Sequence, residues 1–452
     1  MNTYNNFFLN IAKSLIYYKR KVVIIMGKNK KLLYDTYEKP PILKWIVLSM
    51  QHVLAMFGAT VLVPILVNKA AGAEVMSVPI ALICSGVGTL IYILCTKGKS
   101  PVYLGNSFTF ISPIASAFIK GGISGVATGI ISVGLVYILC SFLIRIFGKE
   151  WINKLLPPIV VGPMIIIIGL SLAPSAINQI GLNGAISWQN IIVALVAFTV
   201  TAVVAIYGKG FIKVVPFLFG ILAGYFVSIY IGLVDFNSIS SAPLISLPKL
   251  LLPIKDYSFS LIGMLMIMPI ALVSIAEHLG DHMALSSIID KNLLKDPGLE
   301  RTLLGDGLAT LFAGLVGGPA NTTYGENTSV VGMSRVASVW VIGLAAIISI
   351  CLAFFGKITA FFGSIPDAVL GGVSLILYGF ISANGLKVLI ENKTDFNNIR
   401  NVIIVSTMLI LGLGGAMITI TTKDLSISLA GITLAAIVGI LLNLVLKEPK
   451  EE

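Results

Sequence analysis

The feature that most constrains this chain is a series of apolar runs, most of them about 20 residues long, separated by short polar stretches. A helix needs about 20 apolar residues to cross the hydrocarbon core of a bilayer. Only 11% of the 452 residues are charged, against roughly 25% in soluble domains, so the runs cannot be interior helices of a soluble protein. The chain is therefore predicted to be an all-α polytopic membrane protein without a sizeable soluble domain.

The runs and the polar stretches between them predict fourteen transmembrane segments in two sets of seven. The first set comprises residues 45–67, 76–95, 108–119, 122–147, 155–173, 188–208 and 211–233. A polar connection, residues 234–257, separates the two sets. The second set comprises residues 258–286, 302–316, 326–334, 336–356, 366–384, 399–419 and 425–446.

The basic residues predict the orientation of these segments. An even number of segments places both termini on one side, and fourteen basic loop residues fall on that side against six on the other. Cytoplasmic loops are enriched in Lys and Arg, so both termini are predicted to be cytoplasmic and the protein to lie in the inner cell membrane. The fourteen are Lys97, Lys99, Arg145, Lys149, Lys154, Lys209, Lys213, Lys291, Lys295, Arg301, Arg335, Lys387, Lys393 and Arg400, and the six are Lys69, Lys120, Lys249, Lys255, Lys357 and Lys423.

The same loop residues explain the net charge of +11, so nucleic acid is not expected as a partner. Residues 1–25 carry basic residues without a long apolar core or a small-residue cleavage site, so they do not resemble a signal peptide. We expect translation to begin at Met26.

Seven is an odd number, so the second set must be inverted relative to the first, and the sequence supports such a repeat. Gly86 and Gly88 precede an apolar run and then SPVYLGNSFTF, while Gly305 and Gly307 precede an apolar run and then ANTTYGENTSV. Two interrupted segments at matching places in the two halves of a chain are a pointer to a transport site.

The stretch Gly317–Gly332, GGPANTTYGENTSVVG, is polar, small and glycine-rich in an otherwise apolar sequence. An extended run followed by a helix that begins near Glu326 would present free backbone N–H groups and a positive dipole end to a ligand. The alternative is an ordinary polar loop between two segments.

Ionisable residues also cluster within the segment 258–286, in ALVSIAEHLGDHMALS. Glu277 and Asp281 are spaced i, i+4 and share one helix face, while His278 and His282 share the next. The third histidine, His52, lies in the first segment. Charges inside a membrane are costly, so this cluster is a candidate functional site.

Three chemistries compete for this cluster. The HxxxH spacing suits a metal, but neither HExxH nor CxxC accompanies it. An ExxxD pair suits magnesium in a membrane enzyme, but a second acidic pair and a basic phosphate clamp are missing. A proton-coupled site, where buried carboxylates bind protons and hydrogen-bond a neutral ligand, fits best. We therefore expect no catalytic residue, metal or cofactor, with H⁺ as the coupling ion.

These motifs resemble the nucleobase–ascorbate transporter family, also called nucleobase:cation symporter-2, and most closely its bacterial uracil permeases. The resemblance runs from Trp45 to Leu446. It rests on QHVLAMFGATVLVP at 51–64, YLGNSFTFISP at 103–113, AEHLGDH at 276–282, DPGLERTLLGDG at 296–307 and GGPANTTYGENTSVVGMSRV at 317–336. The last motif is close to the family signature.

The resemblance implies a fold of fourteen segments in two inverted repeats, with short antiparallel strands in segments 3 and 10. Segments 1 to 4 and 8 to 11 would form a core domain and the others a gate domain through which a homodimer could pair. The implied division is an N-terminal cytoplasmic segment (1–44), core (45–147), gate (148–233), extracellular connection (234–257), core (258–356), gate (357–446) and cytoplasmic tail (447–452).

The resemblance also implies the substrate site. Glu277 and Glu326 would accept hydrogen bonds from the uracil ring, and backbone N–H groups near Phe108 and Gly325 would meet its carbonyl oxygens. The Phe108 ring would lie against the base, and Tyr324 would line the site.

The coupling network is expected to comprise Glu277, Asp281, Glu326 and His52. Some uracil-transporting relatives have a histidine where this chain has Asp281. The resemblance therefore implies the position of the coupling group more strongly than it implies which residue type fills it. Glu326 stands where many purine-transporting members have Gln, which favours uracil. The alternative substrates are xanthine and thymine, and the alternative coupling ion is sodium. The alternative protein classes are a membrane enzyme and an anion exchanger or channel of the same fold.

Overall fold

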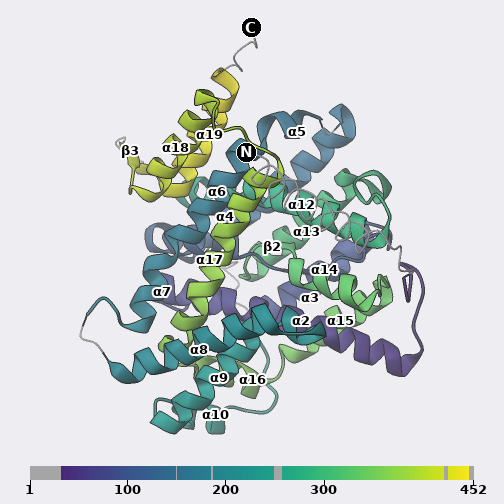
Figure 1. Ribbon diagram of the computed structural model, residues 1–452, viewed down its shortest axis with the longest axis vertical. Helices are drawn as coiled ribbons and strands as arrows, with labels where there is room; N and C mark the ends of the chain where they lie inside the picture. The colour runs from purple at the N-terminus through teal and green to yellow at the C-terminus, as the bar shows by residue number, and fades with distance from the viewer. Residues whose placement is uncertain (1–31, 149, 185–186, 249–256, 422–425, 447–452) are drawn as a thin grey trace, which may run out of the picture.

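The computed structural model describes residues 32–148, 150–184, 187–248, 257–421 and 426–446, and the chain is mostly helical (Figure 1). The predictions for Met26, the tail 447–452 and part of the connection 234–257 lie outside these residues.

The first half of the chain contains α2 (Ile42–Ala71), α3 (Val78–Cys95), β1 (Leu104–Asn106), η1 (Phe108–Phe110), α4 (Ile111–Phe147), α5 (Glu150–Leu155), α6 (Pro158–Ser171), α7 (Ala173–Ile180), α8 (Trp188–Tyr207), η2 (Gly210–Val214), α9 (Pro216–Ile231) and α10 (Asn237–Ser241). The second half contains α11 (Leu261–Ile267), η3 (Met268–Ile270), α12 (Ala271–Ile289), η4 (Leu294–Gly298), α13 (Leu299–Val316), β2 (Asn321–Thr323), α14 (Gly325–Ser334), α15 (Val339–Leu352), α16 (Gly356–Gly363), α17 (Asp367–Glu391), α18 (Ile399–Leu413), β3 (Met417–Thr421), β4 (Ser426–Ala430) and α19 (Gly431–Val445).

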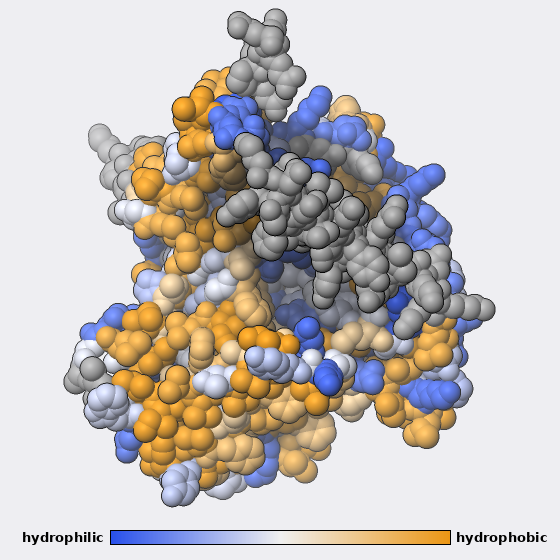
Figure 2. Space-filling view, viewed as in Figure 1, coloured by the Kyte–Doolittle hydropathy of each residue, from blue (hydrophilic) through white to orange (hydrophobic). Residues whose placement is uncertain are grey.

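The helices fit a polytopic membrane protein. Within the described residues, seven helical spans are long and apolar enough to cross a bilayer, and four more apolar helices have 10 to 17 residues. Apolar side chains cover much of the surface over α8 and α9, at the lower left of Figure 2, and include the exposed Leu195, Ile206 and Phe226. The polytopic fold is therefore confirmed, while the count of fourteen segments and their inverted repeat stay predictions.

Two breaks in long apolar runs have identifiable causes. α4 turns at Gly122, whose φ of 58° and ψ of −160° are not helical, and this turn separates the predicted segments 108–119 and 122–147. In the predicted segment 258–286, Pro269 lies in η3 between α11 and α12. Proline removes a backbone donor and clashes with the preceding turn, so the regular α-helix is interrupted there.

The end of the chain corrects two predicted segments. The segments 399–419 and 425–446 were expected to be helical throughout, but α18 ends at Leu413 and α19 begins at Gly431. Between them β3 and β4 pair as antiparallel strands, with Met417 opposite Ala430. The sequence MITIT alternates Ile with Thr, and SISLA alternates Ser with Ile and Leu. β-branched residues such as Ile and Thr favour strands over helices.

The helices around β1 and β2 pack closely on one another. α13 packs against α3 and α4, α15 packs against α2 and α3, and α11 packs against α4. At the crossing of α4 and α13, a Cβ on Gly134 would lie 2.7 Å from the backbone nitrogen of Leu311. Glycine thus brings the two backbones into contact, as small residues do in membrane helix pairs.

A second set of helices packs around α17. This helix contacts α6, α7, α8 and α9, and both α18 and α19 contact α6 (Figure 1). Contacts between the two sets include those of α2 with α9, α6 with α12 and η1, and α19 with η3.

The described end of the N-terminal segment is tied to the loop that follows α14. The Leu33 N–H donates to the Arg335 carbonyl at 2.8 Å, and the Ala337 N–H donates to the Tyr34 carbonyl at 2.9 Å. Lys291 donates to Asp35 at 2.6 Å, and this hydrogen bond holds the pKa of the Asp35 carboxyl below its usual value. The segment therefore joins the C-terminal ends of α12 and α14.

We predict that Gly134→Ala lowers the free energy of unfolding by about 1–3 kcal/mol, because the added methyl group forces α4 and α13 apart. Gly379→Ala in α17 is the matched control, since a Cβ there meets nothing within 4 Å. Thermal unfolding of both purified variants in detergent measures the effect. Equal stability of the two variants would show that the α4–α13 contact is looser than described.

Candidate functional site

The site is built on a pair of three-residue strands that come from opposite halves of the chain. β1 and β2 are antiparallel, with Gly105 opposite Thr322. The Tyr324 N–H donates to the Tyr103 carbonyl at 3.1 Å, and the Ser107 N–H donates to the Ala320 carbonyl at 3.0 Å. The short antiparallel strands predicted for the two interrupted segments are therefore present.

Each strand leads directly into a helical element. η1 and α4 follow β1, and α14 follows β2 with Gly325 as its first residue. The first N–H groups of a helix have no partner within it, and its N-terminus carries a partial positive charge. Both elements thus begin beside the strand pair, and β2 and α14 lie near the middle of the view in Figure 1.

Buried side chains hold the strands in place. The Asn321 Nδ2 donates to the carbonyl oxygens of Cys84 at 3.1 Å and Ala309 at 3.2 Å, which ties β2 to α3 and α13. Gly105 leaves room for the ring of Tyr324, because a Cβ at this position would overlap that ring.

Helix α12 turns its two carboxylates toward the strand elements. The Thr109 hydroxyl donates to Glu277 Oε1 at 2.9 Å and Oε2 at 3.2 Å. The Thr323 hydroxyl donates to Asp281 Oδ2 at 2.6 Å. One carboxylate is therefore bonded to the turn after β1 and the other to the end of β2, and both lie on the same side of α12, as their i, i+4 spacing predicted.

The two histidines of α12 face the other way and are fully buried. His278 Nδ1 lies 2.7 Å from Asp306 Oδ2, and His278 Nε2 lies 2.9 Å from the Thr302 hydroxyl. His282 Nε2 contacts the Tyr92 hydroxyl, and the two imidazole rings stack with their centroids 4.0 Å apart. These bonds join α12 to α13 and α3. Over the described ranges, no group of three or more His, Cys, Asp or Glu side chains is placed to hold a metal ion.

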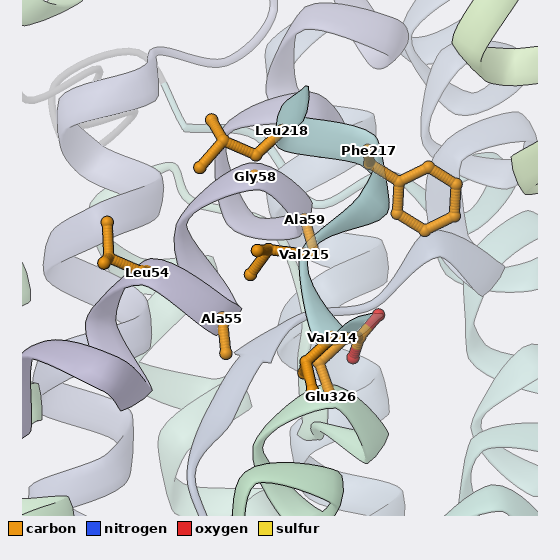
Figure 3. Close-up of a pocket in the computed structure, with 9 residues that line it drawn as sticks. All are labelled: Leu54, Ala55, Gly58, Ala59, Val214, Val215, Phe217, Leu218 and Glu326. Atoms are coloured by element: carbon orange, nitrogen blue, oxygen red, sulfur yellow. The ribbon is translucent and has the colours of Figure 1, made fainter. Parts of the chain in front are cut away.

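Glu326 lies in the first turn of α14 and lines a small, mostly apolar pocket. Glu326 is the charged residue among those that line this pocket (Figure 3). The others come from α2 and from the η2–α9 stretch and are Leu54, Ala55, Gly58, Ala59, Val214, Val215, Phe217 and Leu218.

The three carboxylates form one electrostatic group. Asp281 lies within electrostatic range of both Glu277 and Glu326. A Cβ on the exposed Gly325 would lie 3.8 Å from Asp281 Oδ1, so Asp281 faces the N-terminus of α14. The positive end of that helix stabilises negative charge at this point.

The other predicted site residues have different surroundings. Phe108 is half-buried at the start of η1, where it packs against the apolar core. His52 in α2 is buried, and both its Nδ1 and its carbonyl lie 3.1 Å from Asn327 Nδ2. Across the described residues, His52 makes no hydrogen bond to a carboxylate, and its side-chain partner is Asn327 in α14. A role of His52 beside Glu326 stays a prediction.

The side chain of Tyr324 has a structural role. It is buried, and its hydroxyl donates to the Asn106 carbonyl at 3.0 Å and lies 3.3 Å from the Thr60 hydroxyl. A direct role of this side chain in substrate binding stays a prediction.

Sequence reasoning missed two residues of the site. Asp306 could have been identified from the sequence, because an acidic residue inside an apolar run is unusual and indicates a buried polar contact. Thr109 carries none, because threonines are common in membrane helices and most bond to their own helix. Its contact with Glu277 spans 168 positions of sequence and depends on the tertiary fold.

The chain is similar to known permeases over most of its length. The profile of the Permease family matches residues 43–421. The uracil permease of Bacillus subtilis (strain 168) is 44% identical over 431 residues, which are 94% of this chain and 97% of the relative. The uracil permease of Escherichia coli (strain K12) is 42% identical over 416 residues, which are 91% of this chain and 93% of the relative.

Solved structures with a similar fold are known. The transmembrane domain of the cyanobacterium bicarbonate transporter BicA has a TM-score of 0.59 and 16% identity, with 88% of this chain and 97% of that domain covered. Murine Slc26a9, an anion transporter solved in the inward-facing state, has a TM-score of 0.60 and 12% identity, with 90% of this chain and 68% of that chain covered. At such identities the likeness concerns the fold alone.

We predict that Tyr324→Phe lowers the free energy of unfolding by about 1 kcal/mol, because the buried Asn106 carbonyl loses its donor. Thermal unfolding measures this, with Tyr230→Phe as the control because Tyr230 is exposed on α9. A Tyr324→Phe protein as stable as the unmodified one would contradict the structural role of this hydroxyl.

Proposed function

This chain belongs to the Permease family, the nucleobase–ascorbate transporter family that its motifs resemble, and on that premise we propose that it carries uracil across the cell membrane. Members of this family are transporters and not enzymes. The uracil permeases at 40–44% identity, which match over most of their own length, support the choice of substrate.

The observation that carries the proposal is the set of carboxylates beside the strand pair. Uracil alternates N–H donors with carbonyl acceptors around its ring, so it needs acceptors and donors in alternation. Glu277 and Glu326 supply the acceptors, and the first N–H groups at Phe108 and Gly325 supply the donors. The Phe108 ring lies against the face of the base.

The proposed substrate is favoured over xanthine and over inorganic anions. Xanthine and thymine also offer N–H groups and carbonyls, and Glu326 in place of the Gln of many purine-transporting members favours uracil over xanthine. Inorganic anions suit the similar fold of BicA and Slc26a9, but carboxylates around the site repel an anion. The geometry therefore supports a neutral, hydrogen-bonding ligand.

We further propose that protons drive the transport. A proton would load the network of Glu277, Asp281, Glu326 and His52 before uracil binds. The electrostatic proximity of the three carboxylates supports this, as does the link from His52 through Asn327 to α14. A carboxylate in a site of low polarity gains affinity for protons. Sodium is the alternative coupling ion.

Transport would proceed by alternating access, with the core domain (45–147 and 258–356) moving against the gate domain (148–233 and 357–446). Support comes from the packing, since the helices around the strand pair and those around α17 contact mainly their own set. We also propose that the termini face the cytoplasm, and that two copies can pair through their gate domains.

The proposal is tested by uptake of radiolabelled uracil into proteoliposomes with an imposed inward proton gradient. We expect concentrative uptake that a protonophore abolishes and that excess xanthine does not block. Uptake of xanthine in place of uracil would contradict the substrate assignment, and uptake that follows a sodium gradient would contradict proton coupling.

We predict that Asp281→Asn retains uracil binding but no longer accumulates uracil against its gradient, because the amide can accept the Thr323 hydrogen bond but cannot take up a proton. Counterflow exchange and proton-driven uptake by the same vesicles separate the two activities. Asp367→Asn is the control, since Asp367 pairs with Lys69 at an exposed position. Undiminished proton-driven accumulation by Asp281→Asn would refute the coupling role.

A further inference from the structure

Thr109 differs from the buried threonines of this chain whose hydroxyl groups bond to their own helix. In regular helices the hydroxyl bonds to a backbone carbonyl four residues earlier, as Thr96 does to Tyr92, Thr128 to Ser124 and Thr201 to Ala197. For Thr109 the residue four positions earlier is Gly105, which lies in β1 and pairs with β2. The Thr109 hydroxyl has no helical carbonyl to bond and is available to another group.

That other group is the Glu277 carboxylate. The hydroxyl reaches both of its oxygens, at 2.9 and 3.2 Å, and Thr109 itself is only 3% exposed. Within the described part of the chain, no other side chain donates a hydrogen bond to Glu277. A carboxylate has about four lone-pair sites, so this single shared donor leaves acceptor positions open toward the site.

We propose that Thr109 is a positioning residue that sets base specificity, because it fixes the orientation in which Glu277 accepts an N–H group of the base. This inference rests on the proposed transport of uracil. Thr109 follows Phe108 in the turn η1, so one turn places both the aromatic ring and the carboxylate. The backbone of η1 thereby sets how the Phe108 ring lies relative to the Thr109 hydroxyl that holds the Glu277 carboxylate.

The hydroxyl serves both protonation states of Glu277. It donates to the charged carboxylate, and it can rotate to accept a hydrogen bond from the protonated acid, because a threonine hydroxyl is both donor and acceptor. Valine has nearly the same shape but offers neither function. With valine, Glu277 loses its fixed orientation and can turn away from the N–H group of the base.

The test compares Thr109→Val and Thr109→Ser for the binding of uracil, 1-methyluracil and 3-methyluracil by purified protein. A methyl group in place of the N–H that Glu277 accepts leaves the carboxylate without its partner, so the unmodified protein should reject that isomer. In Thr109→Val we expect uracil to bind about tenfold more weakly while the rejected isomer is unaffected, so that discrimination falls about tenfold. Thr109→Ser should restore it.

The matched control is Thr201→Val in α8, a buried threonine whose hydroxyl bonds only to its own helix in the described structure. It should discriminate like the unmodified protein. Equal weakening of uracil and the methylated isomers by Thr109→Val, or no weakening, would overturn the inference and leave the proposed function intact. If Thr109→Val does not fold, Thr109→Ala against Thr109→Ser makes the same comparison. Failure of the unmodified protein to bind uracil would instead overturn the proposed function.

Discussion

The structure depends on the pairing of β1 with β2 inside an apolar helical bundle. Backbone N–H and carbonyl groups within a membrane need partners, and irregular chain is tolerated there only where other parts of the protein supply them. Each three-residue strand supplies partners for the other, and Asn321 anchors the pair to α3 and α13. The pairing also places the start of α14 beside the start of η1 and α4. Two interrupted segments thereby become one polar site.

Helix α12 completes this site because its two polar faces have different tasks. The histidines bond to Asp306, Thr302 and Tyr92, and these buried contacts fix the helix on α13 and α3. Within the described residues, the opposite carboxylates accept hydrogen bonds from Thr109 in η1 and Thr323 in β2 and keep open acceptor positions. Buried ionisable groups are costly in a membrane. On the histidine face, polar partners offset the cost of burial. On the carboxylate face the acceptor positions stay open, at the site where a ligand and a proton would bind.

Much of this arrangement could be predicted from the sequence, because it follows from strong local signals. Glycine and small polar residues in an apolar run mark the break at β2 and the start of α14, and the i, i+4 spacing places Glu277 and Asp281 on one face. The hairpin of β3 and β4 also carried a local signal, because MITIT and SISLA largely alternate apolar with small polar side chains, a period of two that is typical of strands. The predicted segments 399–419 and 425–446 rested on apolar length and did not use this alternation. The partners of Tyr324, His52 and Thr109 depend on contacts between distant segments, which a single sequence does not reveal.

The central claim is that Glu277 accepts a hydrogen bond from the transported base. Calorimetric titration of uracil into the purified protein and its Glu277→Gln variant tests this most directly. The glutamine amide can keep the Thr109 contact and the shape of the site, but it cannot offer the same pair of acceptor oxygens. Our account predicts saturable binding by the unmodified protein and a loss of about 10- to 100-fold in affinity for the variant, since a hydrogen bond to a charged group contributes about 1.5–3 kcal/mol. Equal affinity of the two proteins for uracil would contradict it.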